Sequence, residues 1–168
     1  ADPTAPPRIF LDQPLNIVEY QLNRLTPAQL ERVPRTDTDA RHQPIHLALL
    51  TRAGVSQASR DGALAALVTL TKTPATEVLV RAAARVAPEQ PLVVDQLAGM
   101  AIAQPAERLS GDREVVARLI GGASDPATLR VGYAALLASA APASAWQLTG
   151  GRLPHVSAFF RAADCGRM

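Results

Sequence analysis

The feature that most constrains the fold of this chain is a recurrence of about 35 residues. Ser56, Pro91 and Pro126 stand 35 residues apart, and each begins an Ala/Leu-rich stretch whose apolar residues recur at helical spacing. A fixed period in this range is typical of repeated helix pairs, which bury their apolar faces only against neighbouring pairs. The period therefore predicts a stack of helix pairs, and such stacks serve mostly as binding surfaces.

Two of these stretches also share a residue pattern, Arg-x-Gly-x-x-Ala-x-Leu. It begins at Arg60 in the first stretch and at Arg130 in the third, 70 residues later, and the middle stretch lacks it. An arginine at the same place in two pairs can cap helix C-termini or bond to the next pair. It can instead line the inner surface and meet an acidic partner. We favour the structural role and keep partner binding as the alternative for Arg60 and Arg130.

The composition indicates a folded helical protein. Hydrophobic residues make up 48% and charged residues 19%, whereas aromatic residues make up only 4%, so alanine and leucine must form the core. The net charge is +2 and the chain has no dense Lys/Arg run, so nucleic acid is not expected as the main partner. No stretch of 18 apolar residues is free of charges and helix breakers, so no membrane span is expected.

Helix-start residues and the absence of strand patterns define the expected fold class. Thr26-Pro27, Thr73-Pro74, Ser110 and Asp125-Pro126 are expected to begin helices, because such residues cap N-termini well. No run alternates strictly between apolar and polar residues. We expect an all-α fold, a short α-solenoid of antiparallel helix pairs with about eight to ten helices. The expected organisation is one compact domain, with an extended arm (1–12), an N-terminal helical block (13–55) and three helix pairs (56–163).

Two segments carry a family resemblance. Ser56–Pro88 contains a helix with an early arginine, an Ala/Leu body, a Thr-Lys-Thr-Pro turn and a second Ala-rich helix, and it resembles a HEAT-type repeat, as does Asp125–Pro142. Residues 15–25 and 44–54 resemble segments that precede HEAT-like repeats in large bacterial extracytoplasmic proteins, some of which carry a c-type haem. The chain has no Cys-x-x-Cys-His motif, so haem attachment does not carry over.

The histidines are the candidate metal ligands. His42 and His46 stand four residues apart across Pro44, with Asp37 and Asp39 upstream as possible oxygen ligands. The alternative, which we favour, makes His42 a solvated cap residue and His46 a half-buried helix residue. His155, Cys165 and Met168 are donor types suited to copper or an axial haem position, but no spacing links them. For these we expect an exposed histidine and a frayed terminus.

The polar loop at 34–43 is the first place to expect a partner, because loops carry binding residues more often than cores do. Its charged residues are Arg35, Asp37, Asp39 and Arg41. The sequence has no nucleophile elbow and no phosphate-binding loop, since its paired glycines stand at helix ends. We therefore expect a non-catalytic module that binds another protein or a neighbouring domain within a larger assembly.

An extracytoplasmic redox accessory associated with a metal or haem is the alternative function, and apart from that association no cofactor is expected. The chain begins Ala-Asp-Pro without methionine. This start is expected either of the mature end of a secreted protein or of an artificial N-terminus. Between compartments we favour a periplasmic or secreted location over a cytoplasmic one.

Overall fold

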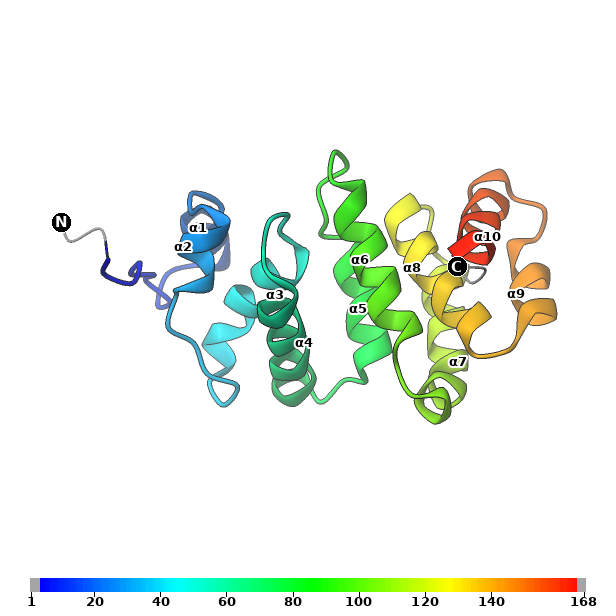
Figure 1. Ribbon diagram of the computed structural model, residues 1–168, viewed down its shortest axis with the longest axis horizontal. Helices are drawn as coiled ribbons and strands as arrows, with labels where there is room; N and C mark the ends of the chain where they lie inside the picture. The colour runs from blue at the N-terminus through cyan, green and yellow to red at the C-terminus, as the bar shows by residue number, and fades with distance from the viewer. Residues whose placement is uncertain (1–3, 166–168) are drawn as a thin grey trace. The chain divides into compact units, whose positions relative to one another are not determined.

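The computed structural model describes residues 4–165, except for the side chain of Cys165. Within this range the chain forms ten α-helices and one short 3-10 helix, with no strand (Figure 1). The predicted all-α class and the predicted number of helices are therefore confirmed. Residues 1–3 of the predicted arm lie outside the described range, and residues 4–12 contain only turns, bends and irregular backbone.

The chain divides into two compact units, Ala1–Thr73 and Pro74–Met168. From the sequence we expected one compact domain, with an internal boundary at Ser56 between the N-terminal block and the helix pairs. The division instead falls between the two helices of the predicted pair at 56–88. At the end of the first unit, Lys72 adopts a left-handed conformation with φ of 52°, which stops the preceding helix.

In the first unit, the central helix packs on the other three α-helices, and leucine and isoleucine side chains fill the space between them. Thr26 forms a capping box, because its Oγ1 accepts the Gln29 backbone N–H at 3.2 Å while Gln29 Oε1 accepts the Thr26 N–H at 2.9 Å. The helices are α1 (Leu15–Asn23), α2 (Pro27–Glu31), η1 (Ala40–His42), the central α3 (Gln43–Thr51) and α4 (Gln57–Thr71).

In the second unit, one helix lies at the centre and packs on all five others. Every residue of this helix from Thr128 to Leu136 is buried. It begins at an Asp125 N-cap, whose carboxylate accepts the Thr128 backbone N–H at 2.9 Å. The helices are α5 (Ala75–Ala83), α6 (Pro91–Ile102), α7 (Ala106–Gly121), the central α8 (Pro126–Ala138), α9 (Pro142–Thr149) and α10 (Leu153–Cys165).

One predicted cap residue and one predicted helix start are wrong. Thr73 does not cap α5, because its hydroxyl donates back to the Thr71 carbonyl and Pro74 takes the N-cap position. Ser110 is an exposed residue inside α7, which begins four residues earlier. Pro105 fixes the backbone there, and the good helix formers Ala106 and Glu107 follow it, so the helix starts before the serine.

The predicted pair at 91–125 is also wrong in its packing, because α6 and α7 are not among the helices that pack extensively on each other. Instead α6 packs on α5 and α8, and α7 packs on α5, α8 and α9.

No single helix of the described residues is long and apolar enough to span a membrane. Only α4 and α5 taken together, counted across the break between them, are long and apolar enough for a membrane span, and this rests on length and composition alone.

Candidate functional site

The loop at 34–43 is held by its own charges. Asp39 caps η1 by accepting the Arg41 backbone N–H at 2.9 Å, and the Arg41 guanidinium lies 2.7 Å from the other carboxylate oxygen. The hydrogen bonds from Arg41 lower the pKa of Asp39 to about 2. Arg41 remains largely exposed, so the Asp39–Arg41 pair forms a stiff, charged corner at the surface.

Both predicted metal-binding histidines bond to one loop residue, Thr36. His42 Nδ1 accepts the Thr36 backbone N–H at 2.8 Å, and His46 Nε2 lies 2.9 Å from the Thr36 carbonyl oxygen. Since a carbonyl only accepts, His46 must carry its proton on Nε2. The two rings thereby anchor the loop to α3. His42 lies mostly covered and His46 is fully buried, so both lie deeper than predicted.

The ring of His46 is neutral, because burial lowers its pKa below 6.5. Its Nδ1 is buried without a hydrogen-bond partner. Among the residues that the structure describes, no group of three or more His, Cys, Asp or Glu side chains could hold a metal ion. The bonds to Thr36 favour a structural role for both histidines over metal binding.

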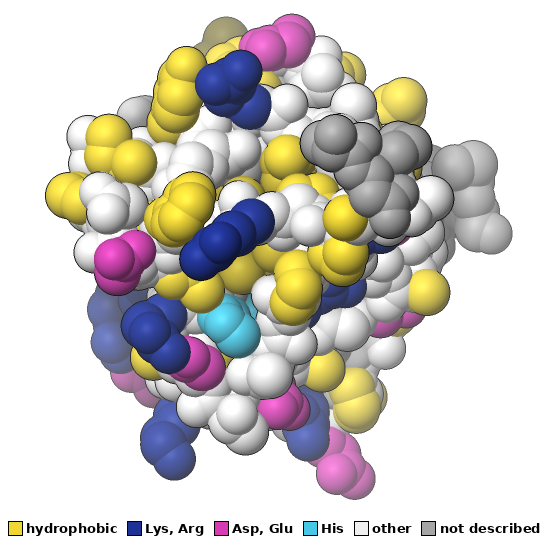
Figure 2. Space-filling model, turned by 90° about the vertical axis from the view of Figure 1, so that its left-hand side faces the viewer, with side chains coloured by type: hydrophobic (Ala, Val, Ile, Leu, Met, Phe, Trp, Pro, Cys, Tyr) yellow, Lys and Arg dark blue, Asp and Glu magenta, His cyan; other side chains and the backbone are white. Residues whose placement is uncertain are grey.

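Three of the predicted site residues, Arg35, Asp37 and His46, line a shallow pocket of about 440 Å³ against α4. Small residues of α4, among them Gly62 and Ala65, form its other wall. Arg35 donates from Nη1 to the backbone carbonyls of Glu31 at 2.8 Å and Val33 at 3.0 Å, so its guanidinium caps the end of α2. On the face of the first unit in Figure 2, basic and acidic side chains alternate with hydrophobic ones, without a field of one charge.

Arg60 cannot bind a partner, because its side chain is fully buried. The guanidinium donates to the backbone carbonyls of Leu50 at 3.1 Å, Arg52 at 3.0 Å and Val55 at 3.3 Å. These carbonyls belong to the end of α3 and the turn after it, which lack helical partners. The structural role that the sequence favoured is therefore the correct one for Arg60.

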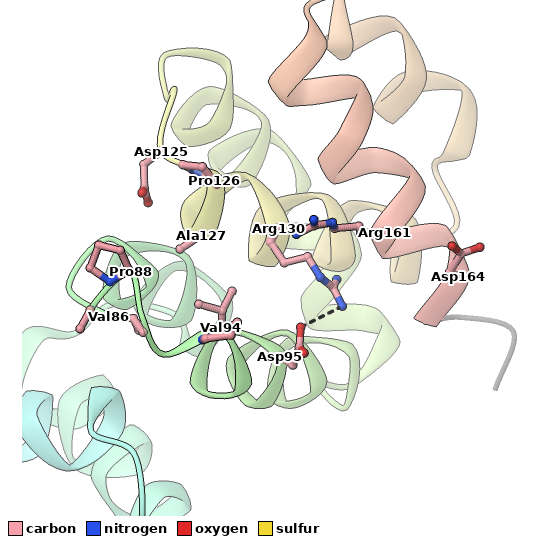
Figure 3. A pocket seen from close by; sticks show the side chains of 12 residues that line it. Val86, Pro88, Val94, Asp95, Asp125, Pro126, Ala127, Arg130, Arg161 and Asp164 are labelled. Carbon is pink, nitrogen blue, oxygen red and sulfur yellow. Dashed lines mark ion pairs between the residues drawn. The ribbon is translucent and has the colours of Figure 1, made fainter.

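Arg130 occupies the matching place in α8 but lies at the wall of a larger pocket of about 560 Å³ (Figure 3). Its side chain is 9% exposed, and its Nη2 lies 3.5 Å from Asp95 Oδ1 of α6. Apolar side chains from the α5–α6 turn, α6 and α8 line the opposite side, and their main members are Val86, Pro88, Val94 and Ala127. Of the predicted binding residues, only Arg130 reaches this pocket.

Three further charges line the pocket, none of them predicted. Asp125 is already used by α8, since it accepts from the Thr128 backbone N–H and hydroxyl. Arg161 and Asp164 of α10 are exposed, and neither forms a hydrogen bond or ion pair with any described residue. The pocket thus combines an apolar wall with charges of both signs, which suits binding of an amphiphilic ligand.

The prediction that His155 is exposed is wrong. Its Nε2 donates to the Ala123 carbonyl at 3.1 Å, and its Nδ1 accepts from the Tyr133 hydroxyl at 2.7 Å. Burial lowers its pKa below 6.5, so the neutral ring joins α10 to α8 and to the turn before α8. Met168 and the side chain of Cys165, its proposed companions in a metal site, lie outside the described residues.

An aromatic cluster on α9 and α10 is a second feature that the sequence reasoning missed. Trp146 lies 5.2 Å from Phe159 and 5.9 Å from Phe160 between ring centroids, all in edge-to-face contact. Trp146 is 47% exposed and Phe160 55% exposed. The sequence did contain a signal for this cluster, because three of the chain's six Phe, Tyr and Trp residues fall between positions 146 and 160.

Comparison of the chain with family models, with curated proteins and with solved structures finds no match. The two pockets and the aromatic cluster are therefore the features of the molecule that bear on its function.

Proposed function

We propose that this chain is a non-catalytic helical-repeat module that binds a protein partner. In this proposal the second unit is a short HEAT-like stack of three helix pairs, α5–α6, α7–α8 and α9–α10. The pairs are shifted by one helix from those that the sequence suggested, because the recurring stretches at Ser56, Pro91 and Pro126 begin second helices rather than first ones.

The packing of the second unit supports this assignment. Within each proposed pair the two helices pack on each other, and the second helices α6, α8 and α10 form a continuous series of contacts. The first helices α5, α7 and α9 form a parallel series. The outer pairs, α5–α6 and α9–α10, are not among the elements that pack extensively on each other. Contact restricted to neighbouring pairs is the property that defines a solenoid.

The observation that carries the binding function is the exposed aromatic cluster of Trp146, Phe159 and Phe160. Leu153, which is 78% exposed, is a further uncovered apolar side chain of α10. Tryptophan and phenylalanine are enriched at protein interfaces, where their burial contributes much of the binding energy. The expected partner therefore presents an apolar surface to α9 and α10.

Site-specific photo-cross-linking in the source cells tests the proposal. The photoreactive amino acid p-benzoylphenylalanine replaces Phe160 in one variant and Trp146 in another. Both positions are expected to give a covalent adduct with the same protein on irradiation. The matched control carries the photoreactive residue at Glu107, an exposed position of α7.

Adducts at Phe160 and Trp146 but not at Glu107 would support docking through the cluster. Adducts at all three positions would indicate non-specific capture and contradict it. Irradiation without any adduct at the two cluster positions would also overturn the proposal, provided that circular dichroism shows the variants to be folded.

A further inference from the structure

The pocket of about 560 Å³ in the second unit has two chemically different ends. Figure 3 shows Val86, Pro88 and Ala127 grouped at one end, and Arg130, Arg161 and Asp95 grouped at the other. Asp125 also lies at the first end, where its carboxylate is already bonded to Thr128. The volume falls in the range typical of sites for small organic ligands, roughly 300–1,000 Å³. A ligand that fills the pocket must therefore carry an apolar part and a polar part.

The charges at the polar end leave room for one negative and one positive group of a ligand. Arg161 reaches from α10 toward Arg130 (Figure 3) and forms no hydrogen bond or ion pair within the described chain. Both guanidinium groups line the pocket, and Arg161 can donate to a carboxylate there, with the positive charge of Arg130 adding to the attraction.

Asp95 provides the site for the positive group. Its only ion pair with a described residue, to Arg130, spans 3.5 Å, longer than the usual 2.7–3.2 Å of an N–H···O hydrogen bond. The Asp95 side chain is 58% exposed, so its carboxylate keeps acceptor positions for an ammonium group. Asp164 also lines the pocket, but Figure 3 shows its carboxylate apart from Asp95, so it does not belong to the ammonium site.

We propose that this pocket binds a small zwitterion with apolar side chains, in the size range from a free amino acid to a short peptide. The carboxylate lies at Arg161 with Arg130 behind it, and the ammonium group bonds to Asp95. The apolar side chains lie against Val94, Ala127 and the α5–α6 turn. The inference goes beyond protein docking and does not depend on it, because the aromatic cluster contributes no residue to this pocket.

Titration of the isotopically labelled chain, followed by amide NMR, tests the site with four matched probes. Dileucine carries both charges, N-acetyl-dileucine lacks the ammonium and dileucine amide lacks the carboxylate. Dileucine is expected to shift the amide signals of Val94 and Ala127. Each of the two blocked probes is expected to bind about tenfold more weakly, the effect of losing one charge-assisted hydrogen bond.

Leucine, the fourth probe, separates the two sources of the zwitterion. If dileucine binds more tightly than leucine, the ligand is a short peptide. If leucine binds as tightly as dileucine, the ligand is a free amino acid. Failure of both to shift the pocket signals at millimolar concentration would overturn the proposal, as would equal binding of dileucine and its two blocked forms.

Variants of the pocket test which residue binds the carboxylate and which binds the ammonium group of the ligand. Arg161→Ala is expected to weaken dileucine binding about tenfold yet leave binding of dileucine amide unchanged, because the amide has no carboxylate to lose. Asp95→Asn should weaken dileucine but not N-acetyl-dileucine. Arg118→Ala removes the same charge from an exposed site on α7 and should change nothing. If a variant weakened the binding of all probes equally, or if Arg118→Ala weakened dileucine binding as much as Arg161→Ala does, the charge assignment would be refuted. The probe series on the unaltered chain tests the site independently of these variants.

Discussion

The helices α4 and α8 share the pattern Arg-x-Gly-x-x-Ala-x-Leu, yet the arginine and glycine of the pattern have different structural roles in the two helices. Arg60 of α4 is fully buried and bonds three backbone carbonyls, whereas Arg130 of α8 lies at a pocket wall beside Asp95. For the glycines, the closely packed position is the one in α8 and the open position is the one in α4. Gly132 lies against Ile120 of α7, while a side chain at Gly62 would meet nothing within 4 Å.

The difference follows from what surrounds each helix. α8 lies at the centre of its unit and packs on five helices, so its glycine is needed for close approach. α4 packs extensively on α3 within its own unit, so part of its surface stays open at the shallow pocket. A shared pattern therefore does not establish a shared role, and substitutions of the two arginines and the two glycines test this conclusion.

The largest effect is expected for Arg60→Met. The carbonyls of Leu50, Arg52 and Val55 lose their donor in a buried place, which should destabilise the first unit by about 3 kcal/mol. Arg130→Met should cost less, about 1 kcal/mol, because its ion pair with Asp95 spans 3.5 Å and the Asp95 side chain is 58% exposed. Hydrogen exchange with peptide-level mass spectrometry measures both, and equal losses would show that the two arginines play equivalent structural roles.

Gly132→Ala should destabilise the second unit by about 2 kcal/mol, since the added methyl group would overlap Ile120 Cγ2 and force α7 and α8 apart. Trp146 is the only tryptophan of the chain and lies in this unit, so its fluorescence during urea unfolding reports the change. If Ile120→Ala is combined with Gly132→Ala, the steric part of the loss should disappear. An unchanged unfolding midpoint in the single variant would show that α7 and α8 are not closely packed there.

Gly62→Ala should act in the opposite direction and stabilise the first unit by about 0.5–1 kcal/mol. The position lies within α4 with open space around it, so alanine removes the entropy cost of a helical glycine without a clash. The matched pair, Gly62→Ala and Gly132→Ala, thus differs in sign. Hydrogen exchange of α4 measures the gain, and a destabilised α4 would contradict the open surface.

The smallest effect between pH 7 and pH 6 should come from the buried histidines, one in each unit. Burial lowers the folded-state pKa of His46 and of His155 below 6.5, so the unfolded chain binds protons first as the pH falls. Stability is then fully present above about pH 6.5 and is lost as the pH falls toward the folded pKa. Trp146 unfolding curves between pH 7.5 and 5 should show this decline for the second unit, where His155→Gln should flatten it, and hydrogen exchange of α3 over the same pH range should show it for the first.

Local sequence signals predicted much of the secondary structure, because caps and prolines act within a few residues. Asp125 and Thr26 each cap a helix as predicted, and Ser56 caps the helix that it was expected to begin, since their side-chain oxygens accept the backbone N–H three residues on. Thr73 failed as a cap because the adjacent Pro74 takes the N-cap position, and Ser110 failed as a helix start because α7 already begins after Pro105. Which helices pack together was less predictable, since the period does not say which helix begins a pair.

The candidate sites show the same limit. Arg35, Asp37 and His46 were singled out as one loop and its following helix, and they do line one pocket. Arg161 and Asp164 could not be connected with Arg130 from sequence, because they lie more than 30 residues away and only the packing of α10 on α8 brings them together. His155 was misjudged for the same reason, since its partners Tyr133 and Ala123 are distant in the chain.

By itself, the sequence determined that this protein is built from short helices and where most of them begin. Helix formation depends on spacing and on end residues, and both are local properties. The tertiary structure alone decided which arginine is buried, which glycine is covered and which charges share a pocket. Those outcomes depend on the neighbours that each helix acquires, and contacts between distant segments leave no local mark in the chain.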